Sequence, residues 1–136
     1  LHSFPTRRSS DLGDFLRSKG KECMQGLLIR HKDIDVLYSH NDGMTLGAIE
    51  AIEAVGLTPG KDIVIITVDG EQAAIDLLKA GKINCVVECN PMIGDKIMEL
   101  AKRLAAGETI PRDTYTEEQV FSEFTPDLQN LPPREY

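Results

Sequence analysis

Two short polar side chains, Asn41 and Asp69, stand at the ends of apolar runs in the sequence. Asn41 lies just beyond the run of residues 36–38, and Asp69 directly follows the β-branched run of residues 62–68. Amide and carboxylate groups bind hydroxyl groups through paired donor and acceptor bonds, and bonds to a charged group are the stronger ones. The two side chains therefore suit a neutral polyol better than a phosphate or a nucleic acid.

Further candidates stand near the start of the chain and after residue 82. Phe15 is aromatic, and its ring can pack on the C–H side of a sugar ring or, equally, in a hydrophobic core. Glu88, Cys89 and Asn90 end another apolar run, over residues 82–89. These residues would add an acidic group, a thiol and an amide to the same kind of site.

The central pair also has purely structural interpretations. Asn41 or Asp42 can cap the amino end of the helix that follows, by accepting a bond from a first-turn N–H group. Asp69-Gly70 can likewise have a purely structural role, as the turn between a strand and a helix. A cap at one of the two residues does not exclude ligand contact by its neighbour, so both interpretations stay open.

The elements that must position these residues alternate along the chain. Apolar periodicity predicts helices at residues 13–32, 42–56, 71–80 and 91–107, and strands at residues 35–38, 62–68, 82–89 and, weakly, 114–121. Strands joined by amphipathic helices are expected to run parallel, so we predict an α/β fold with a parallel sheet flanked by helices on both faces. Ligands bind at the carboxyl ends of the strands in such sheets. We therefore expect Asn41 and Asp69 to meet at that edge.

Composition narrows the classes of function. The chain has 136 residues, a formal net charge of −7 and 5% aromatic residues without Trp. This balance argues against a general nucleic-acid or anionic-membrane surface. No run approaches the roughly 18 apolar residues of a membrane span.

Catalysis, cofactors and metals find little support. Gly-rich phosphate loops and the G-x-S-x-G elbow are absent from the sequence, so we expect no nucleotide cofactor and no enzyme activity. A carboxylate such as Glu88 raises the pKa of a neighbouring thiol, which makes Cys89 a poor nucleophile. The three cysteines Cys23, Cys85 and Cys89 lack metal-binding spacing, and we expect no metal site.

The beginning of the chain differs from the rest. Residues 1–12 lack an initiator Met, and they are basic and Ser-rich, whereas the remainder is acidic and periodic. They resemble translated adapter sequence, so we expect residues 1–12 to be a non-native artefact and the natural sequence to begin near Gly13.

Four short motifs carry a family resemblance. They are GDFLRSKG at residues 13–20, HNDGM at 40–44, VDG at 68–70 and ECNP at 88–91. In this order they resemble the carboxyl-terminal half of periplasmic sugar-binding proteins, the solute receptors of ribose/galactose-type ABC transporters. The galactofuranose-binding branch shares the GDF-x-RSKGKE and VE-x-x-P strings.

The resemblance implies a role for each site residue. Phe15 resembles the aromatic that packs on the sugar ring, Asn41 the amide that bonds ring hydroxyls, and Asp69 the carboxylate that bonds two hydroxyls. Ribose receptors carry Gln at the position of Cys89, and Glu88 beside it is the implied substitute. Arg17 has two interpretations, a sugar or hinge contact and a helix-surface ion pair.

The resemblance also implies a two-lobed receptor that closes on its ligand. Residues 13–90 would belong to the carboxyl-terminal lobe, residues 91–125 would return to the amino-terminal lobe, and residues 126–136 would form a tail. The implied partners are a monosaccharide and a membrane permease. The implied receptor is a monomer in the periplasm, or lipid-anchored outside a Gram-positive cell.

Two other classes remain as alternatives. The effector-binding domain of a lac-repressor-like transcription regulator shares the fold and the Asn and Asp positions. A receiver-like signalling domain would use Asp69 as phosphoacceptor, but the paired acidic cluster and downstream Lys that it needs are not found at the strand ends. The RSKGKE string and the acidic balance favour the sugar receptor.

Overall fold

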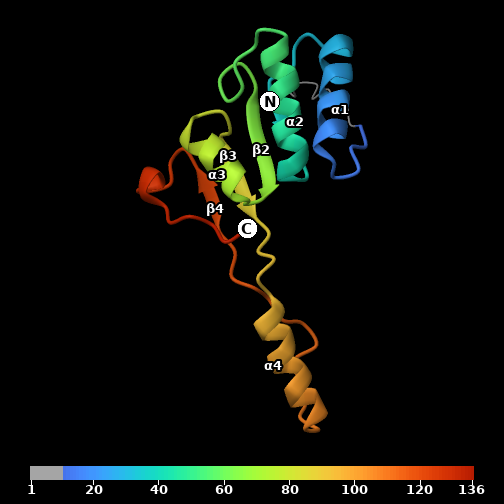
Figure 1. Ribbon diagram of the computed structural model, residues 1–136, viewed down its shortest axis with the longest axis vertical. Coiled ribbons are helices and arrows are strands. Elements are labelled where there is room, and N and C mark those ends of the chain that lie inside the picture. Colours follow the sequence, from blue (N-terminus) through green and yellow to red (C-terminus); the bar gives the residue numbers. More distant parts are fainter. Residues whose placement is uncertain (1–10) are drawn as a thin grey trace, which may run out of the picture.

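The computed structural model describes residues 11–136 (Figure 1). The predicted artefact at residues 1–12 therefore lies almost wholly outside the described residues. Helices and strands alternate through the described chain and are followed by a short 3-10 helix: α1 (Arg17–Arg30), β1 (Val36–Tyr38), α2 (Asp42–Ala54), β2 (Val64–Asp69), α3 (Gln72–Lys79), β3 (Cys85–Glu88), α4 (Gly94–Ala105), β4 (Val120–Ser122) and η1 (Leu128–Asn130). The predicted α/β order is confirmed.

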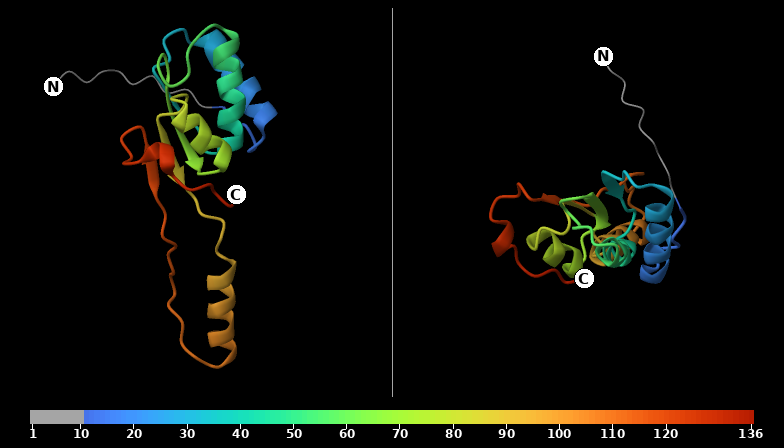
Figure 2. Two further views of the ribbon diagram at one scale, coloured as in Figure 1. Left: turned by 60° about the vertical axis from the view of Figure 1, so that its left-hand side comes forward. Right: turned by 90° about the horizontal axis from the view of Figure 1, so that it is seen from above.

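The strands form one mixed sheet in the order β1-β2-β3-β4. Strands β1, β2 and β3 run parallel, with Val36 beside Val64 and Asp69 beside Glu88. Strand β4 runs antiparallel to β3, with Phe121 beside Val86, so the prediction of an all-parallel sheet is wrong for this strand. After α4 the chain comes back to the side of the sheet at which β3 ends (Figure 2). Because β4 starts at the side where β3 ends, β4 must run antiparallel to β3.

The pairing also shows the course of the described chain after residue 91. The predicted strand at residues 114–121 forms at Val120–Ser122, and it extends the same sheet. The predicted tail at residues 126–136 is not merely irregular, because it contains η1 and hydrogen-bonds to α3 through Gln72 and Lys79.

Helices α1, α2 and α3 lie on one face of the sheet (Figure 2). Their apolar side chains pack with inward-facing strand residues into one core, which includes Met24, Ile49, Ile52, Ile65, Ile75, Leu78, Val86 and Phe121. Alternate strand residues point away from these helices, and Val36, Tyr38, Val64 and Val120 are exposed. The prediction of helices on both faces is therefore not met within residues 11–136, where α1–α3 cover a single face.

The contact between α1 and α2 is a close approach of two backbones. A Cβ atom on Gly47 would lie 2.0 Å from the carbonyl oxygen of Arg17, and one on Gly20 would lie 2.3 Å from the carbonyl oxygen of Met44. Such separations are far below van der Waals contact, so only glycine fits at both positions. This approach fixes the start of α1, with Phe15 just before it, beside the start of α2.

Helix α4 extends away from the rest of the molecule (Figure 1). None of its residues is buried. Among the residues of its predicted apolar stripe, Ile97 and Leu104 are more than half exposed. No helix within residues 11–136 is long and apolar enough to cross a membrane.

Candidate functional site

Asn41 and Asp69 meet at the carboxyl edge of the sheet, as the strand pattern predicts. The Asn41 Nδ2 group donates a hydrogen bond of 2.7 Å to Asp69 Oδ2. Asn41 lies between β1 and α2, and Asp69 is the last residue of β2. Parallel pairing of β1 with β2 brings these two ends to one side.

Asn41 has a structural role as well. Its Oδ1 atom accepts a bond of 2.9 Å from the backbone N–H of Met44, which makes Asn41 the N-cap of α2. The capping interpretation is thus confirmed for Asn41, and the amide still has its Nδ2 group directed at Asp69. The two ends of one side chain connect the helix start to the carboxylate.

Asp42, which the sequence suggested only as a cap, has a buried carboxylate beneath this pair. It is fully buried and accepts bonds from the Thr67 hydroxyl at 2.6 Å and from the backbone N–H groups of Gly70 and Glu71, each at 2.8 Å. Burial raises the pKa of Asp42, while the bonds from Thr67, Glu71 and Gly70 oppose that rise. The carboxylate therefore ties α2 to the turn that follows Asp69.

That turn is conformationally strained. Asp69 has a φ of 125° and Gly70 a φ of 93°. A non-glycine residue in this region costs about 1–3 kcal/mol and persists where the surroundings over-determine it. The bonds from Asn41 and to Asp42 supply that constraint. Within the described residues no hydrogen bond reaches Asp69 Oδ1, so this oxygen is available to accept a bond from a ligand.

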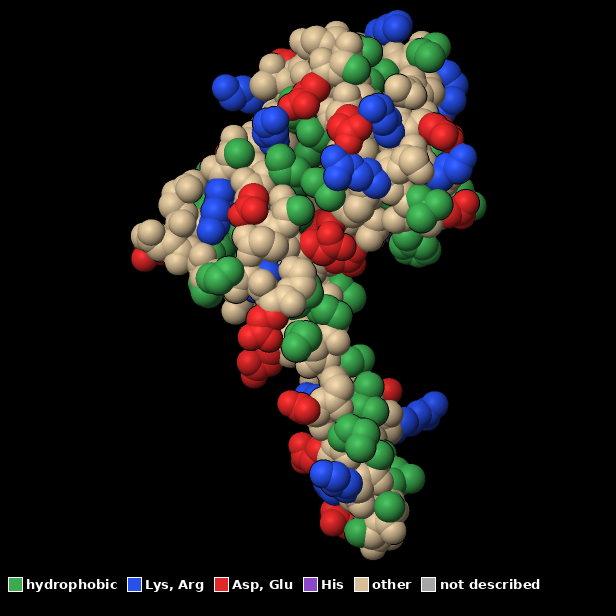
Figure 3. Space-filling model, in the orientation of Figure 1, with side chains coloured by type: hydrophobic (Ala, Val, Ile, Leu, Met, Phe, Trp, Pro, Cys, Tyr) green, Lys and Arg blue, Asp and Glu red, His purple; other side chains and the backbone are tan. Residues whose placement is uncertain are grey.

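The edge is acidic. Burial raises the pKa of Glu71, and the nearby charges of Asp42 and Asp69 raise it further. Figure 3 shows acidic side chains gathered where the body of the molecule meets the extended segment. Concentrated carboxylates favour groups that donate hydrogen bonds, such as hydroxyls, and repel anions.

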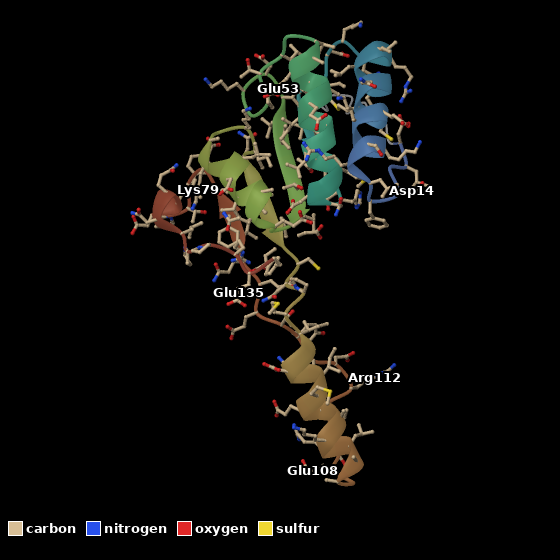
Figure 4. The ribbon with its side chains drawn as sticks, in the orientation of Figure 1. Asp14, Glu53, Lys79, Glu108, Arg112 and Glu135 are labelled. Atoms are coloured by element: carbon tan, nitrogen blue, oxygen red, sulfur yellow. The ribbon has the colours of Figure 1, made fainter. Side chains whose placement is uncertain are left out.

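Phe15 is exposed, so the interpretation as a core residue is wrong. Its side chain is 74% exposed, and both Asp14 and Phe15 have positive φ values, of 48° and 62°. Its carbonyl oxygen lies only 3.5 Å from the position that a Cβ of Gly43 would take. Asp14, labelled in Figure 4, marks this end of α1. The backbone of Phe15 thus lies near the start of α2, and the residue is open to solvent.

Arg17 is not brought to the Asn41–Asp69 pair. Its Nε and Nη2 groups donate to Glu50 Oε1 at 2.9 and 2.6 Å, and Lys21 donates to the other oxygen of Glu50 at 2.8 Å. Lys21 and Arg17 lower the pKa of Glu50 through these bonds. Of the two interpretations of Arg17, the structure shows the ion pair on the helix surface.

Glu88 lies beside Asp69 in the sheet, but its oxygens are already occupied. It is 6% exposed and accepts bonds from Arg134, from the Tyr136 hydroxyl at 2.5 Å and from the Gln119 N–H at 2.8 Å. This leaves Glu88 as a supporting residue of the edge. Arg134 and Tyr136 were not foreseen, because the nearby prolines indicated an irregular tail.

Cys89 is exposed and follows β3 directly. Its backbone N–H donates to the Asp69 carbonyl at 2.8 Å, so the residue borders the strained turn. Cys23, Cys85 and Cys89 are free thiols, and burial raises the pKa of Cys85. Within residues 11–136, no cluster of His, Cys, Asp and Glu side chains could hold a metal ion.

Two cavities lie at opposite edges of the sheet. The smaller, of about 290 Å³, is lined by Glu88, Asn90, Met92, Arg134 and Tyr136 at the carboxyl edge. The larger, of about 430 Å³, lies near the amino ends of β1 and β2, and its lining mixes apolar residues such as Leu28 and Ile34 with charged ones such as Lys32 and Asp62. It lies at the opposite end of the strands from Asn41 and Asp69, so we do not take it as the candidate site.

Comparisons with known proteins agree on one family. A family model described as a periplasmic binding protein domain matches residues 10–109. The galactofuranose-binding protein YtfQ of Escherichia coli strain K12 is 37% identical over 105 residues, which are 75% of this chain and 33% of that protein. The ribose import binding protein RbsB of Bacillus subtilis strain 168 is 38% identical over 100 residues, which are 73% of this chain and 32% of that protein.

A solved structure shows the same fold with a bound sugar. The crystal structure from Mycobacterium smegmatis in complex with β-D-fucofuranose has a TM-score of 0.80 and 47% identity, over 83% of this chain and 37% of that chain. The chain spans about a third of the length of the curated relatives that it matches. Because the family model covers most of the chain, the chain belongs to the family of periplasmic binding protein domains.

Proposed function

We propose that the chain is the carboxyl-terminal part of the solute-binding component of a sugar ABC importer, and that this receptor binds a neutral, galactofuranose-like monosaccharide. The observation that carries the proposal is the bond between Asn41 and Asp69 at the carboxyl edge of the sheet. Relatives named for galactofuranose and ribose binding, and a structural relative that holds a fucofuranose, support this class of ligand.

Each residue of the edge has a chemical role in this proposal. Asp69 accepts hydrogen bonds from two ring hydroxyls, one of them at Oδ1, and Asn41 bonds a neighbouring hydroxyl. Phe15, which is exposed at the start of α1, packs on the C–H side of the ring. Cys89 borders the ligand, and Glu88 supports the edge from below. No step of bond making or breaking is involved, so the receptor is a binding protein and needs no cofactor.

The proposed ligand lies between two lobes. Residues 13–90, with β4, form one of them, and the segment with α4 reaches toward the second. The exposed apolar stripe of α4 supports this assignment, because such a stripe needs a partner surface. The partners we propose are the sugar and a membrane permease, with the receptor monomeric in the periplasm or lipid-anchored outside the cell. The acidic edge gives no support to nucleic-acid binding.

The proposal is tested on the complete receptor, produced from the whole gene that encodes this chain. Calorimetric titration measures its binding of galactose, ribose and arabinose. One sugar should bind with a roughly micromolar or lower dissociation constant. Asp69→Ala should weaken that binding by about 2–5 kcal/mol, because it leaves buried hydroxyl groups unpaired. Asp35→Ala, at an exposed residue just before the amino end of β1, is the matched control and should bind normally.

The isolated chain gives a second test of the same proposal. With half of the proposed site absent, the 136-residue chain should bind these sugars only weakly or not at all. A dissociation constant of roughly micromolar order for the isolated chain would contradict the two-lobed site. A loss below about 0.5 kcal/mol for Asp69→Ala in the complete receptor would reject the proposed role of Asp69.

A further inference from the structure

The last residues of the chain run back along α3 to the carboxyl edge of the sheet. Near the end of α3, Lys79 donates to the Leu131 carbonyl at 3.2 Å. At its start, the Gln72 N–H donates to the Tyr136 carbonyl at 2.9 Å, and the Gln72 side chain accepts a bond of 2.6 Å from the Arg134 N–H. Figure 4 labels Lys79 and Glu135 near the two ends of this path.

The same residues grip the end of β3. Arg134 donates to Glu88 and to the Tyr136 hydroxyl, and that hydroxyl donates to the same Glu88 oxygen at 2.5 Å. The guanidinium group also lies over two aromatic rings, 5.2 Å from the centre of Phe121 and 4.9 Å from that of Tyr136. We call the group formed by Gln72, Glu88, Arg134 and Tyr136 the carboxyl-terminal clasp.

The clasp contains a feature that stability alone does not explain. Within the described residues, the Arg134 Nε group is buried without a hydrogen-bond partner. A buried donor left unpaired is unfavourable, and well-packed apolar residues often replace a buried ion pair without loss of stability. The arrangement is better explained by the geometry that it imposes on its neighbours.

Those neighbours are the end of β3 and the start of α3, which lie on either side of the strained turn. Asp69 pairs with Glu88 in the sheet, and the Cys89 N–H donates to the Asp69 carbonyl at 2.8 Å. On the other side, the turn of Asp69, Gly70 and Glu71 leads directly into Gln72, the first residue of α3. The clasp therefore fixes the end of β3 and the start of α3, and both of these border the strained turn.

We propose that the carboxyl-terminal clasp fixes the turn that presents Asp69, and that Arg134 is a positioning residue for this carboxylate. Asn41 and Asp42 hold the turn from the α2 side, and the clasp holds it from the β3 and α3 side. The consequence for sugar affinity rests on the proposed function, whereas the effect on the turn does not.

Amide hydrogen exchange of the 136-residue chain, measured by NMR, tests the effect on the turn. The primary variant is Arg134→Lys, which keeps a cation beside Glu88 but loses the planar guanidinium group that lies over the Phe121 and Tyr136 rings. The informative amides are those of Gly70, Glu71 and Cys89, because their acceptors, Asp42 and Asp69, are left unchanged. Their exchange should become at least about tenfold faster, as expected for a local opening.

Controls separate a positioning role from a general one. Glu135→Gln changes an exposed residue inside the same tail and should leave all exchange rates unchanged. The amide of Leu28, buried in distant α1, should also keep its rate in the Arg134→Lys variant. Tyr136→Phe removes only one hydroxyl and should accelerate the same turn amides by a smaller factor.

Two outcomes would overturn the proposal. In the first, unchanged rates at Gly70, Glu71 and Cys89 would show that Arg134 affects no more than its own contacts. In the second, equal acceleration at Leu28 would show that Arg134 stabilises the whole chain and does not position the turn. A sugar titration of the complete receptor separates this proposal from the proposed function. Faster exchange at the turn without any sugar binding would support the positioning role of the clasp and reject the proposed function. Sugar binding that weakens at least about tenfold in Arg134→Lys would support both the positioning role and the proposed function.

Discussion

The body of the molecule, residues 11–88 and 120–136, and the arm, residues 89–119, both contain amphipathic helices, but only the body has a core. Ile52 of α2 is 0% exposed, whereas Ile97 of α4 is 53% exposed. A helix forms in both places, and the apolar residues are more strongly one-sided in α4 than in α2. The comparison shows that periodicity predicts a helix and its apolar face, while stability depends on a partner for that face.

The largest effect should come from emptying the core of the body. Ile52→Ala removes a fully buried side chain and leaves a cavity, so the free energy of unfolding should fall by about 4 kcal/mol. Urea denaturation of the 136-residue chain, followed by circular dichroism, measures this change. A loss below about 1 kcal/mol would show that α2 does not pack as closely as the structure indicates.

The next effect concerns the close contact of α1 and α2. Gly47→Ala places a methyl group 2.0 Å from the Arg17 carbonyl oxygen, and the two helices must separate. We expect a loss of about 3 kcal/mol, at the upper end of the range for overpacking. Gly26→Ala is the matched control, because its methyl group would meet only the movable end of the Arg30 side chain.

That control should be neutral or stabilise the chain by up to about 1 kcal/mol, since alanine favours helix more than glycine does. Equal losses for the two variants would mean that the glycines matter only through helix propensity. The contact at Gly47 would then not be what holds the start of α1, with Phe15 before it, beside the start of α2.

The parts of the body that the sequence predicts are those built from local patterns. Apolar periodicity placed α1–α3 and β1–β3, and parallel pairing placed Asn41 beside Asp69. Strand β4 is only three residues long, and its direction depends on where the arm returns, so no local pattern determines it. Within residues 11–136, α1–α3 cover only one face of the sheet. This too depends on how the helices are arranged in space, which no local pattern determines.

The least predictable features of the site involve long-range partners. The sequence suggests Glu88 as a ligand contact because it gives no sign that Arg134 is its partner. Arg134 lies 46 residues further on, and no spacing rule connects the two residues. Asp42 resembled a helix cap beside Asn41, whereas its partners lie 25 to 29 residues downstream. One signal was available: Thr67 places a hydroxyl group inside a β-branched apolar run, and a buried hydroxyl needs a partner.

An intermediate effect should follow from changing that buried carboxylate. Asp42→Ala removes the Oδ2 atom that accepts both the Gly70 and the Glu71 N–H groups, and leaving these donors unpaired should cost about 2 kcal/mol at neutral pH. The exposed arm residue Asp113 offers the matched variant Asp113→Ala, for which no loss is expected. Equal losses for both would remove the distinction between body and arm at these carboxylates.

The pH dependence of stability sharpens this result. Burial raises the pKa of Asp42, so the folded chain keeps this proton to a higher pH than the unfolded chain. The associated stability is fully present below the ordinary pKa of Asp and is lost as the pH rises through the raised pKa. Asp42→Ala removes this titration, so the unfolding free energy of the variant should fall less over that window. An identical slope in both proteins would contradict the burial of the charge.

The smallest effect is expected in the arm. Ile97→Ala removes a side chain that is 53% exposed in a helix without buried residues, so the free energy of unfolding of the 136-residue chain should change by less than about 0.5 kcal/mol. In the complete receptor, where we propose that the arm meets a second lobe, the same substitution should cost about 2–5 kcal/mol, as at a buried isoleucine. Urea denaturation of both proteins measures the difference. A loss above about 1 kcal/mol in the 136-residue chain would mean that the apolar stripe of α4 is already covered there, and the contrast between body and arm would fail.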